Sequence, residues 1–115
     1  MIEVHEEVFA VVNVGSLGNA DFFAAVRDAD GKLTLILPEK HLKDLEFSEV
    51  EKGFRLITFR TKLPFDTVGF IAKVSSALAR EGIPILVLSS FSTDHILVRN
   101  EHVERAVEIL EKVVL

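Results

Sequence analysis

The chain has 115 residues, and its 18 acidic and 13 basic side chains give it a formal net charge of -5. An acidic chain without a run of lysine or arginine is repelled by nucleic acid and by anionic lipid, so we expect neither as a partner. The sequence has no cysteine, which excludes disulfides, thiol nucleophiles and thiolate metal sites and is typical of a reducing compartment. No apolar run reaches the roughly 20 residues that span a bilayer. The start of the chain is acidic, unlike a secretory signal, so we expect a cytoplasmic protein.

The first half of the sequence predicts three strands and a short helix. Residues 8–14 are apolar and β-branched, as in a well-buried strand, and turn-forming residues follow them. Alternating apolar side chains over residues 22–37, interrupted by the turn sequence DADG, predict a hairpin. Pro38 ends the hairpin and opens a short helix over residues 39–45, since proline is tolerated in a first helical turn.

The second half begins, after an acidic linker over residues 46–52, with a strand over residues 54–60. A helix follows this strand. Asp66 or Thr67 is placed to cap the start of the helix, and Gly82 resembles the glycine that commonly ends one. The apolar stripe of the helix comprises Val68, Ile71, Val74, Ser75 and Leu78.

Two further strands and a second helix complete the predicted elements. Residues 84–91 and 94–98 are predicted strands, with a turn between them. Asn100 is expected to cap a helix whose buried face comprises Val103, Ala106, Val107 and Leu110. The apolar residues 113–115 predict a short terminal strand.

The two halves of the sequence resemble each other. Residues 35–42 align with residues 96–103, and in both places an apolar strand leads into a helix at a histidine. We therefore predict an α+β fold on the ferredoxin-like βαββαβ plan, with two pseudo-repeated lobes, antiparallel sheets and helices on one face. The lobes are residues 1–53, where the opening helix is reduced to a loop, and residues 54–115.

Residues 63–71 (LPFDTVGFI) and 88–98 (LSSFSTDHILV) carry a family resemblance. Together they resemble the ACT domain, and more narrowly the small stand-alone ACT-like proteins related to the regulatory domains of aspartate kinase and to cytosolic arginine sensors. The second half of the chain carries nearly all of the resemblance. It implies a non-catalytic regulatory module that binds an amino acid, or a similar small metabolite, where two such modules pack.

The resemblance places ligand-binding residues in those two stretches. A glycine at the start of a helix lets a carboxylate reach backbone N–H groups at the positive end of the helix dipole. An acidic side chain nearby can pair with an α-ammonium group, and small polar and aromatic side chains can line a pocket. The expected site comprises Asp66, Thr67, Val68, Gly69, Ser90, Phe91, Thr93 and Asp94. Because arginine sensors carry an acidic residue at the position of Thr67, arginine is disfavoured as the ligand.

Each candidate has a structural alternative. Gly69 also suits close packing of a helix on a sheet, and Asp66 or Thr67 also suits a helix cap. Asp94 is also a common turn residue. Ser89, Ser90 and Phe91 are equally consistent with an ordinary edge strand.

The remaining polar residues predict no catalytic or metal site. His41, His95 and His102 fall on different elements without ligand spacing, and we interpret them as surface residues. No nucleophile–base pair, nucleotide loop or cofactor motif is present in the sequence, so we expect no enzyme and no cofactor. The sequence therefore predicts an amino-acid-binding regulator, expected to be a homodimer. The alternative is an interaction module that regulates an enzyme of amino-acid metabolism without a ligand.

Overall fold

The computed structural model describes residues 2–60 and 67–114. These residues form two compact units, one of which combines Met1–Glu6 with Arg55–Leu115 while the other is Glu7–Phe54. We call the first the helical unit and the second the strand unit. The structure thus groups the first six residues with the second half of the chain. The lobe boundary expected between residues 53 and 54 stays a prediction.

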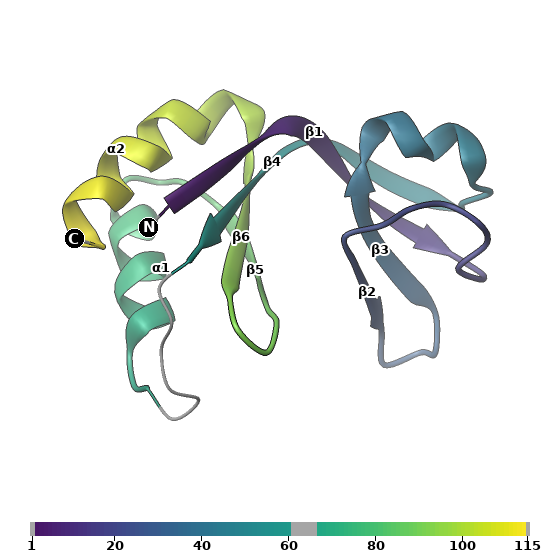
Figure 1. The fold of residues 1–115 in the computed structure, drawn as a ribbon, viewed down its shortest axis with the longest axis horizontal. Coiled ribbons are helices and arrows are strands. Elements are labelled where there is room, and N and C mark those ends of the chain that lie inside the picture. Colours follow the sequence, from purple (N-terminus) through teal and green to yellow (C-terminus); the bar gives the residue numbers. More distant parts are fainter. Residues whose placement is uncertain (1, 61–66, 115) are drawn as a thin grey trace. The chain divides into compact units, whose positions relative to one another are not determined.

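The strand unit is a small sheet with one short 3₁₀-helix (Figure 1). Its strands lie in the order β2 (Ala24–Arg27), β3 (Leu33–Pro38), β1 (Ile2–Val14) and β4 (Glu49–Phe59). Strand β3 pairs antiparallel with both β2 and β1, and the 3₁₀-helix η1 (Glu39–Asp44) follows it. The residues that form the core of this unit are apolar side chains of the strands, the loop after β1 and η1, namely Ala10, Val12, Val14, Ala20, Leu35, Leu37 and Leu42.

The turn of the β2–β3 hairpin is the predicted one. The Asp28 carboxylate accepts hydrogen bonds from the backbone N–H groups of Asp30 and Lys32, at 2.8 and 3.0 Å. Gly31 has a φ of 83°, a left-handed conformation that glycine adopts without steric cost. The side chain of Asp28 thus fixes the turn that the sequence DADG indicates.

The predicted starts of strands β1 and β4 are wrong. Strand β1 begins at Ile2 rather than at residue 8, because Ile2 and Val4 pack on the core of the helical unit while the polar residues that alternate with them lie on the other face. The expected linker over residues 46–52 is partly a strand, since β4 begins at Glu49. Within the strand unit β4 is an edge strand, where charged side chains can face water while the backbone joins the sheet.

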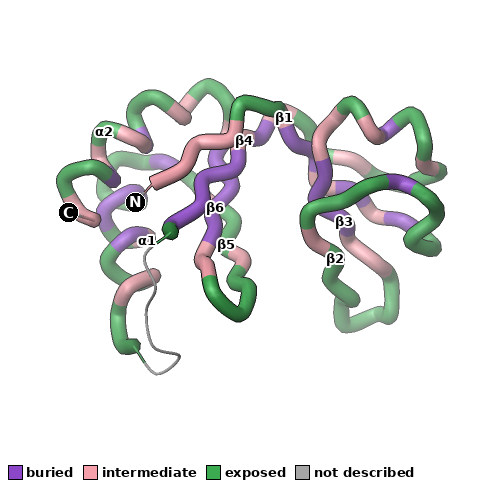
Figure 2. Tube along the Cα trace, viewed as in Figure 1, coloured by how far each residue is buried: buried purple, intermediate pink, exposed green. Residues whose placement is uncertain are grey.

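The helical unit has its strands in the order β1, β4, β6 (Asp94–Arg99) and β5 (Ile85–Ser89). Helices α1 (Phe70–Arg80) and α2 (Val103–Val113) lie together on one face of these strands (Figure 1). Figure 2 shows buried backbone along β4 and β6 and exposed residues on the outer sides of the helices. The core consists of strand residues at alternate positions together with the inward residues of the helices, namely Ile57, Phe59, Val74, Leu78, Ile83, Ile96, Val98, Ala106 and Leu110.

The end of α1 is confirmed and its start is corrected. The N–H of Ile83 donates to Leu78 O and that of Gly82 to Ala79 O, which is the Schellman pattern. The helix begins only at Phe70, with Gly69 at its N-cap and no side-chain cap. Thr67 is therefore not a cap, and Asp66 lies outside the described residues. Because the helix starts so late, Val68 does not belong to its buried stripe.

The entry into α2 also differs from the prediction. A 3₁₀-helix, η2 (Asn100–His102), precedes α2, and no side chain caps either helix. The Asn100 side chain instead accepts a hydrogen bond from Arg55 at 3.4 Å. Helix α2 continues to Val113, so the expected terminal strand is wrong for this residue, and residue 115 lies outside the described part. No helix among the described residues has the length and hydrophobicity of a transmembrane span.

Candidate functional site

The first candidate feature is the opening turn of α1. Gly69 has a φ of 91°, and a Cβ built at this position would meet no atom of the described residues within 4 Å. The backbone conformation therefore favours glycine here, whereas close packing does not require it. No side chain caps the helix, so the N–H groups of its first turn have no side-chain acceptor from a capping residue. The alternative interpretation of Gly69 as a packing residue is not supported.

The second feature is the turn between β5 and β6, which a set of hydroxyl hydrogen bonds closes. The N–H of Ser90 donates to Thr93 O at 2.9 Å, and the N–H of Thr93 donates to Ser90 Oγ at 3.2 Å. Ser90 Oγ also donates to Thr93 O at 3.1 Å and lies 2.9 Å from Thr93 Oγ1. Hydrogen bonds between Ser90 and Thr93 therefore close the turn.

Asp94 follows this turn and is held by the neighbouring strand. Ser89 Oγ donates to Asp94 Oδ1 at 2.6 Å, and the two residues are directly paired across β5 and β6. Asp94 is only partly exposed, whereas Phe91, at the tip of the turn, is 85% exposed. The Asp94 carboxylate thus accepts a hydrogen bond from a serine hydroxyl on the paired strand.

The start of α1 and the β5–β6 turn lie at the same end of the helical unit (Figure 1). Val68 is 96% exposed, and Thr67 and Gly69 are exposed as well. The expected site residues in the described part of the chain thus fall in two segments, an exposed one at the helix start (67–69) and a partly exposed one on the hairpin (90–94). Their assignment to a ligand stays a prediction.

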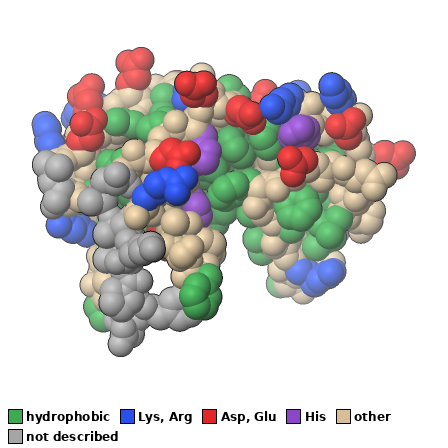
Figure 3. Space-filling view, viewed as in Figure 1, with side chains coloured by type: hydrophobic (Ala, Val, Ile, Leu, Met, Phe, Trp, Pro, Cys, Tyr) green, Lys and Arg blue, Asp and Glu red, His purple; other side chains and the backbone are tan. Residues whose placement is uncertain are grey.

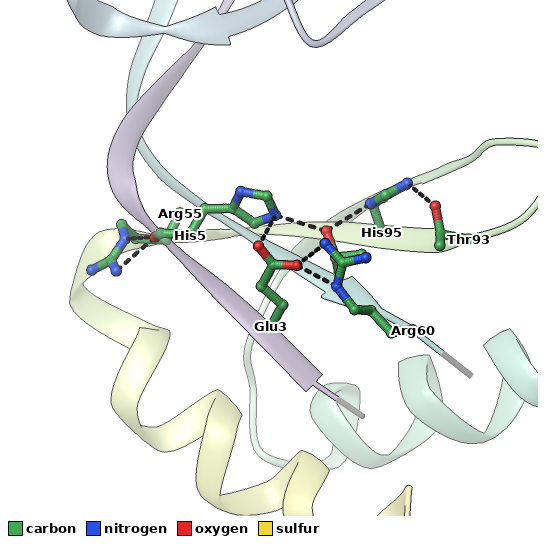
Figure 4. Close-up of polar contacts among 7 residues, drawn as sticks. Glu3, His5, Arg55, Arg60, Thr93 and His95 are labelled. Carbon is green, nitrogen blue, oxygen red and sulfur yellow. Dashed lines mark hydrogen bonds and ion pairs between the residues drawn. The ribbon is translucent and has the colours of Figure 1, made fainter. Parts of the chain in front are cut away.

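A chain of side-chain hydrogen bonds crosses the sheet of the helical unit from β1 to the β5–β6 turn. His5 Nε2 lies 2.8 Å from Thr58 Oγ1, and Thr58 Oγ1 lies 2.9 Å from His95 Nδ1. His95 Nε2 lies 2.9 Å from Thr93 Oγ1, which in turn contacts Ser90 Oγ. We call these five residues the relay. Figure 4 shows the imidazoles of His5 and His95 and the hydroxyl of Thr93 in this arrangement.

Charged side chains flank the β1 end of the relay. Glu3 Oε2 lies 3.8 Å from His5 Nε2, and the guanidinium of Arg60 pairs with the same carboxylate (Figure 4). Arg55 donates two hydrogen bonds to the backbone oxygen of His5, at 2.8 and 2.9 Å. In Figure 3 histidine side chains lie beside acidic and basic groups over the strands of this unit. The position of His5 is therefore fixed through its backbone as well as through its ring.

His95 sits in a different environment from His5. His95 belongs to β6, and the residue is only 5% exposed. Burial lowers the pKa of the His95 imidazole below its usual 6.5, and the nearby His5 lowers this pKa further. Asp94 and Glu3 act in the opposite direction, while Arg60 also lowers the pKa. Both ring nitrogens are hydrogen-bonded to threonine hydroxyls, which compensates the burial of a polar ring.

The interpretation of His95 as a surface residue is therefore wrong, because Thr58 and Thr93 supply partners for both ring nitrogens. The sequence carries a signal for the contact between Thr93 and His95. Residues two apart in a strand share one face of the sheet, so the sequence TDH places Thr93 beside His95. His5 and Thr58 carry no such signal, because their contact depends on the pairing of distant strands. The described residues hold no cluster of three His, Asp or Glu side chains that suits a metal ion.

The family model of the ACT domain matches residues 49–112, more than half of the chain. The chain belongs to the ACT domain family. The matched range covers β4 to α2, which includes the helix start, the β5–β6 turn and all of the relay except His5. No curated protein matches this ACT-domain sequence.

Solved structures resemble the ACT-domain protein over nearly its whole length. A Vibrio cholerae protein of unknown function, described as a possible transport protein, is 29% identical with a TM-score of 0.80, covering 95% of this chain and 85% of that one. An Agrobacterium tumefaciens protein is 24% identical with a TM-score of 0.82, covering 97% of this chain and 87% of the other. The ligand-free regulatory subunit of Thermus thermophilus aspartate kinase is 11% identical with a TM-score of 0.69, covering 97% and 95%.

These likenesses confirm the predicted fold class and the family resemblance. The protein is a mixed α+β protein with antiparallel strand pairs and an ACT-like fold shared with aspartate kinase regulatory subunits. At identities of 11 to 16%, the aspartate kinase structures show the fold alone.

Proposed function

We propose that this ACT-domain protein is a non-catalytic regulator that binds a free amino acid at the end of the helical unit where α1 begins and the β5–β6 turn lies. The observation that carries the proposal is the start of α1. Its glycine N-cap has a φ of 91°, and within the described part of the chain no atom lies near the position of a Cβ and no side chain caps the helix. Backbone N–H groups at such a helix start favour a carboxylate.

The hairpin would supply the other half of the proposed site. Asp94 would pair with the α-ammonium group of the ligand, as a carboxylate does in a charge-assisted hydrogen bond. Ser90 and Thr93 would present hydroxyl groups, while Phe91 and Val68 would cover the apolar part of the ligand. Thr67 and Asp66 complete the proposed set. Bound ligand would act by stabilising whichever assembly state of the protein it prefers.

The assembly that we propose is a homodimer acting in the cytoplasm, in keeping with the absence of cysteine. Its support is strand β5, the edge of the sheet in the helical unit, where Leu86 and Val87 are each 45% exposed. Exposed apolar side chains on an edge strand are typical of a surface that a partner covers. Sedimentation of the purified protein as a monomer at micromolar concentration would overturn the dimer.

The first experiment is a thermal-shift screen against the twenty amino acids. A ligand at 100 times its dissociation constant stabilises the folded state by about 2.7 kcal/mol, which raises the midpoint by roughly 10 °C for a domain of this size. Calorimetry should then show a clear loss of affinity in Asp94→Asn. The control Asp44→Asn, an exposed acid in the strand unit, should bind normally. If no amino acid shifts the midpoint, the ligand proposal fails.

A second candidate function is a ligand-independent module that regulates a partner enzyme of amino-acid metabolism. The exposed apolar residues of β5 favour it, since they suit a protein surface as well as a second copy of the chain. The two candidates differ in one measurement. A single stoichiometric partner recovered equally with and without amino acids supports this second function.

A further inference from the structure

The turn of the β2–β3 hairpin holds two aspartates in different states. Oδ1 of Asp28 accepts hydrogen bonds from the N–H groups of Asp30 and Lys32, at 2.8 and 3.0 Å. The Asp30 carboxylate has no hydrogen bond or ion pair within the described part of the chain, and the residue is exposed. The carboxyl group of Asp28 is therefore engaged in holding the turn, whereas that of Asp30 is available for reaction.

Asp30 is also the one aspartate of the sequence that precedes a glycine. A backbone nitrogen can attack the side-chain carboxyl carbon of the aspartate before it, because the ring that results has five members. A side chain on the attacking residue hinders this approach, and glycine has none. The other aspartates precede Phe22, Ala29, Leu45, Thr67 and His95. The sequence thus singles out Asp30 for this reaction.

The closed turn restrains the attacking nitrogen. The N–H of Gly31 donates to Asp28 O at 3.0 Å, so this nitrogen is engaged as long as the turn is closed. Residues 28–32 are all exposed, and they join β3 to β2, which lies at the edge of the sheet. Exposed segments of this kind open locally at a small cost in free energy. Each opening frees the Gly31 nitrogen beside the carboxyl group of Asp30.

We propose that Asp30 is a site of spontaneous isoaspartate formation and that the Asp28 side chain sets its rate by keeping the turn closed. The Gly31 nitrogen forms a bond to Cγ of Asp30, and the hydroxyl of the protonated carboxyl group leaves as water with the amide proton. Water then adds to one of the two ring carbonyl carbons. Cleavage between the nitrogen and Cγ restores aspartate, whereas cleavage between the nitrogen and the main-chain carbonyl carbon gives isoaspartate. The mass is unchanged, and no oxidant or reductant takes part.

Isoaspartate changes the turn as well as the residue. The main chain then runs through Cβ and Cγ of residue 30, which lengthens the turn by one carbon and leaves the α-carboxylate as the side group. The longer turn moves the Gly31 N–H away from its acceptor on Asp28. Because the turn fixes the register of a hairpin, the change loosens β2, whose neighbour in the described sheet is β3 alone.

The test is prolonged incubation of the purified full-length protein at neutral pH, followed by peptide mapping and by methylation with an isoaspartyl carboxyl methyltransferase. We expect methyl acceptance to accumulate in the peptide that carries residue 30. It should be lost in Asp30→Glu, because glutamate would need a six-membered ring. In guanidinium chloride the same protein should react faster at residue 30, since the turn is open. Isoaspartate that forms at Asp44 or Asp94 of the folded protein as fast as at Asp30 would overturn the proposal.

Two variants test the role of Asp28. Asp28→Ala removes the acceptor of two N–H groups and should raise the rate at residue 30 roughly tenfold, as expected for the loss of such hydrogen bonds. Asp28→Ser retains a hydroxyl that accepts more weakly, so its rate should lie between the two. Asp44, also in the strand unit, should react no faster in either variant. An unchanged rate at residue 30 in Asp28→Ala, or an equal rise at Asp44, would overturn the local control by Asp28.

Discussion

In the two units of this ACT-domain protein the chain leaves β3 and β6 in the same way and then diverges. Pro38, the last residue of β3, has φ and ψ of -57° and 139°, and Arg99, the last residue of β6, has -61° and 143°. Each is followed by a 3₁₀-helix, yet η1 ends at Asp44 while η2 leads into α2, which continues to Val113. A proline locks φ at this value and an arginine adopts it freely.

The difference shows which part of the sequence decides each feature. The exit turn is local and is common to both units. The length of the helix depends on the residues beyond that turn, because the positions after 102 bring apolar side chains to one face every three or four residues, including Ala106 and Leu110. After Leu42 no such period continues. The strand unit therefore has a core without an α-helix.

The largest loss of stability should come from truncating a side chain that is buried under α2, because only the helical unit has an α-helix in this position. Leu110→Ala leaves a cavity under α2, where the side chain is fully buried, and should lower the free energy of unfolding by about 2–5 kcal/mol. Leu42→Ala, at 9% exposure on the short η1, should cost less. Urea denaturation checks both values. Equal losses would show that η1 stabilises its unit as strongly as α2 does.

Alanine substitutions at two glycines, Gly15 after β1 and Gly69 before α1, should differ in stability by a smaller amount. Gly69→Ala places a side chain at a φ of 91° and should cost about 1 kcal/mol through backbone strain, since no atom of residues 2–60 or 67–114 blocks the Cβ. Gly15→Ala, also in open space but without a positive φ, should be neutral or slightly stabilising. Thermal unfolding measures both. A neutral Gly69→Ala would remove the conformational argument for this glycine.

The stability of the protein should depend on pH through His95 in the helical unit. Because the folded state lowers the pKa of His95, the unfolded chain binds a proton more readily below pH 6.5. Stability should therefore fall as the pH drops below about 6.5, and it should be fully retained above this value. His95→Gln should reduce the fall, whereas His41→Gln in η1 should keep it. Urea midpoints at pH 7.5 and 5.5 provide the measurement.

The smallest effect should come from an ion pair of the strand unit. Lys40 Nζ lies 2.9 Å from Glu7 Oε1, and the two side chains are 62% and 46% exposed. Solvent screens such a pair, so Lys40→Ala should change stability by no more than about 0.5 kcal/mol. The small change should vanish at high salt. A larger or salt-independent loss would point to packing of the lysine stem.

The sequence predicts those features that depend on neighbouring residues. The DADG turn, the glycine stop of α1 and the fold family follow from short patterns, and all are confirmed. The start of α1 is not predictable in this way, because the helix begins at Phe70, later than the residues expected to cap it, and has no side-chain cap. The contact between His5 and Thr58 spans 53 positions. Only the pairing of distant strands brings these two side chains together, and single-sequence periodicity carries no information on that pairing.

The helical unit is built from two separate segments of the chain, because strand β1 contributes its first residues to this unit. Residues 2–6 of this strand are made before the strand unit, whereas their neighbours in the helical unit begin at Arg55. The strand unit, residues 7–54, is contiguous and is complete on the ribosome before the other unit has its second segment. The helical unit can therefore close only after a loop of about 50 residues brings its first strand back, which raises its contact order and slows its folding relative to a contiguous domain. A fragment that begins at Arg55 should accept a synthetic peptide of the first residues as its missing strand.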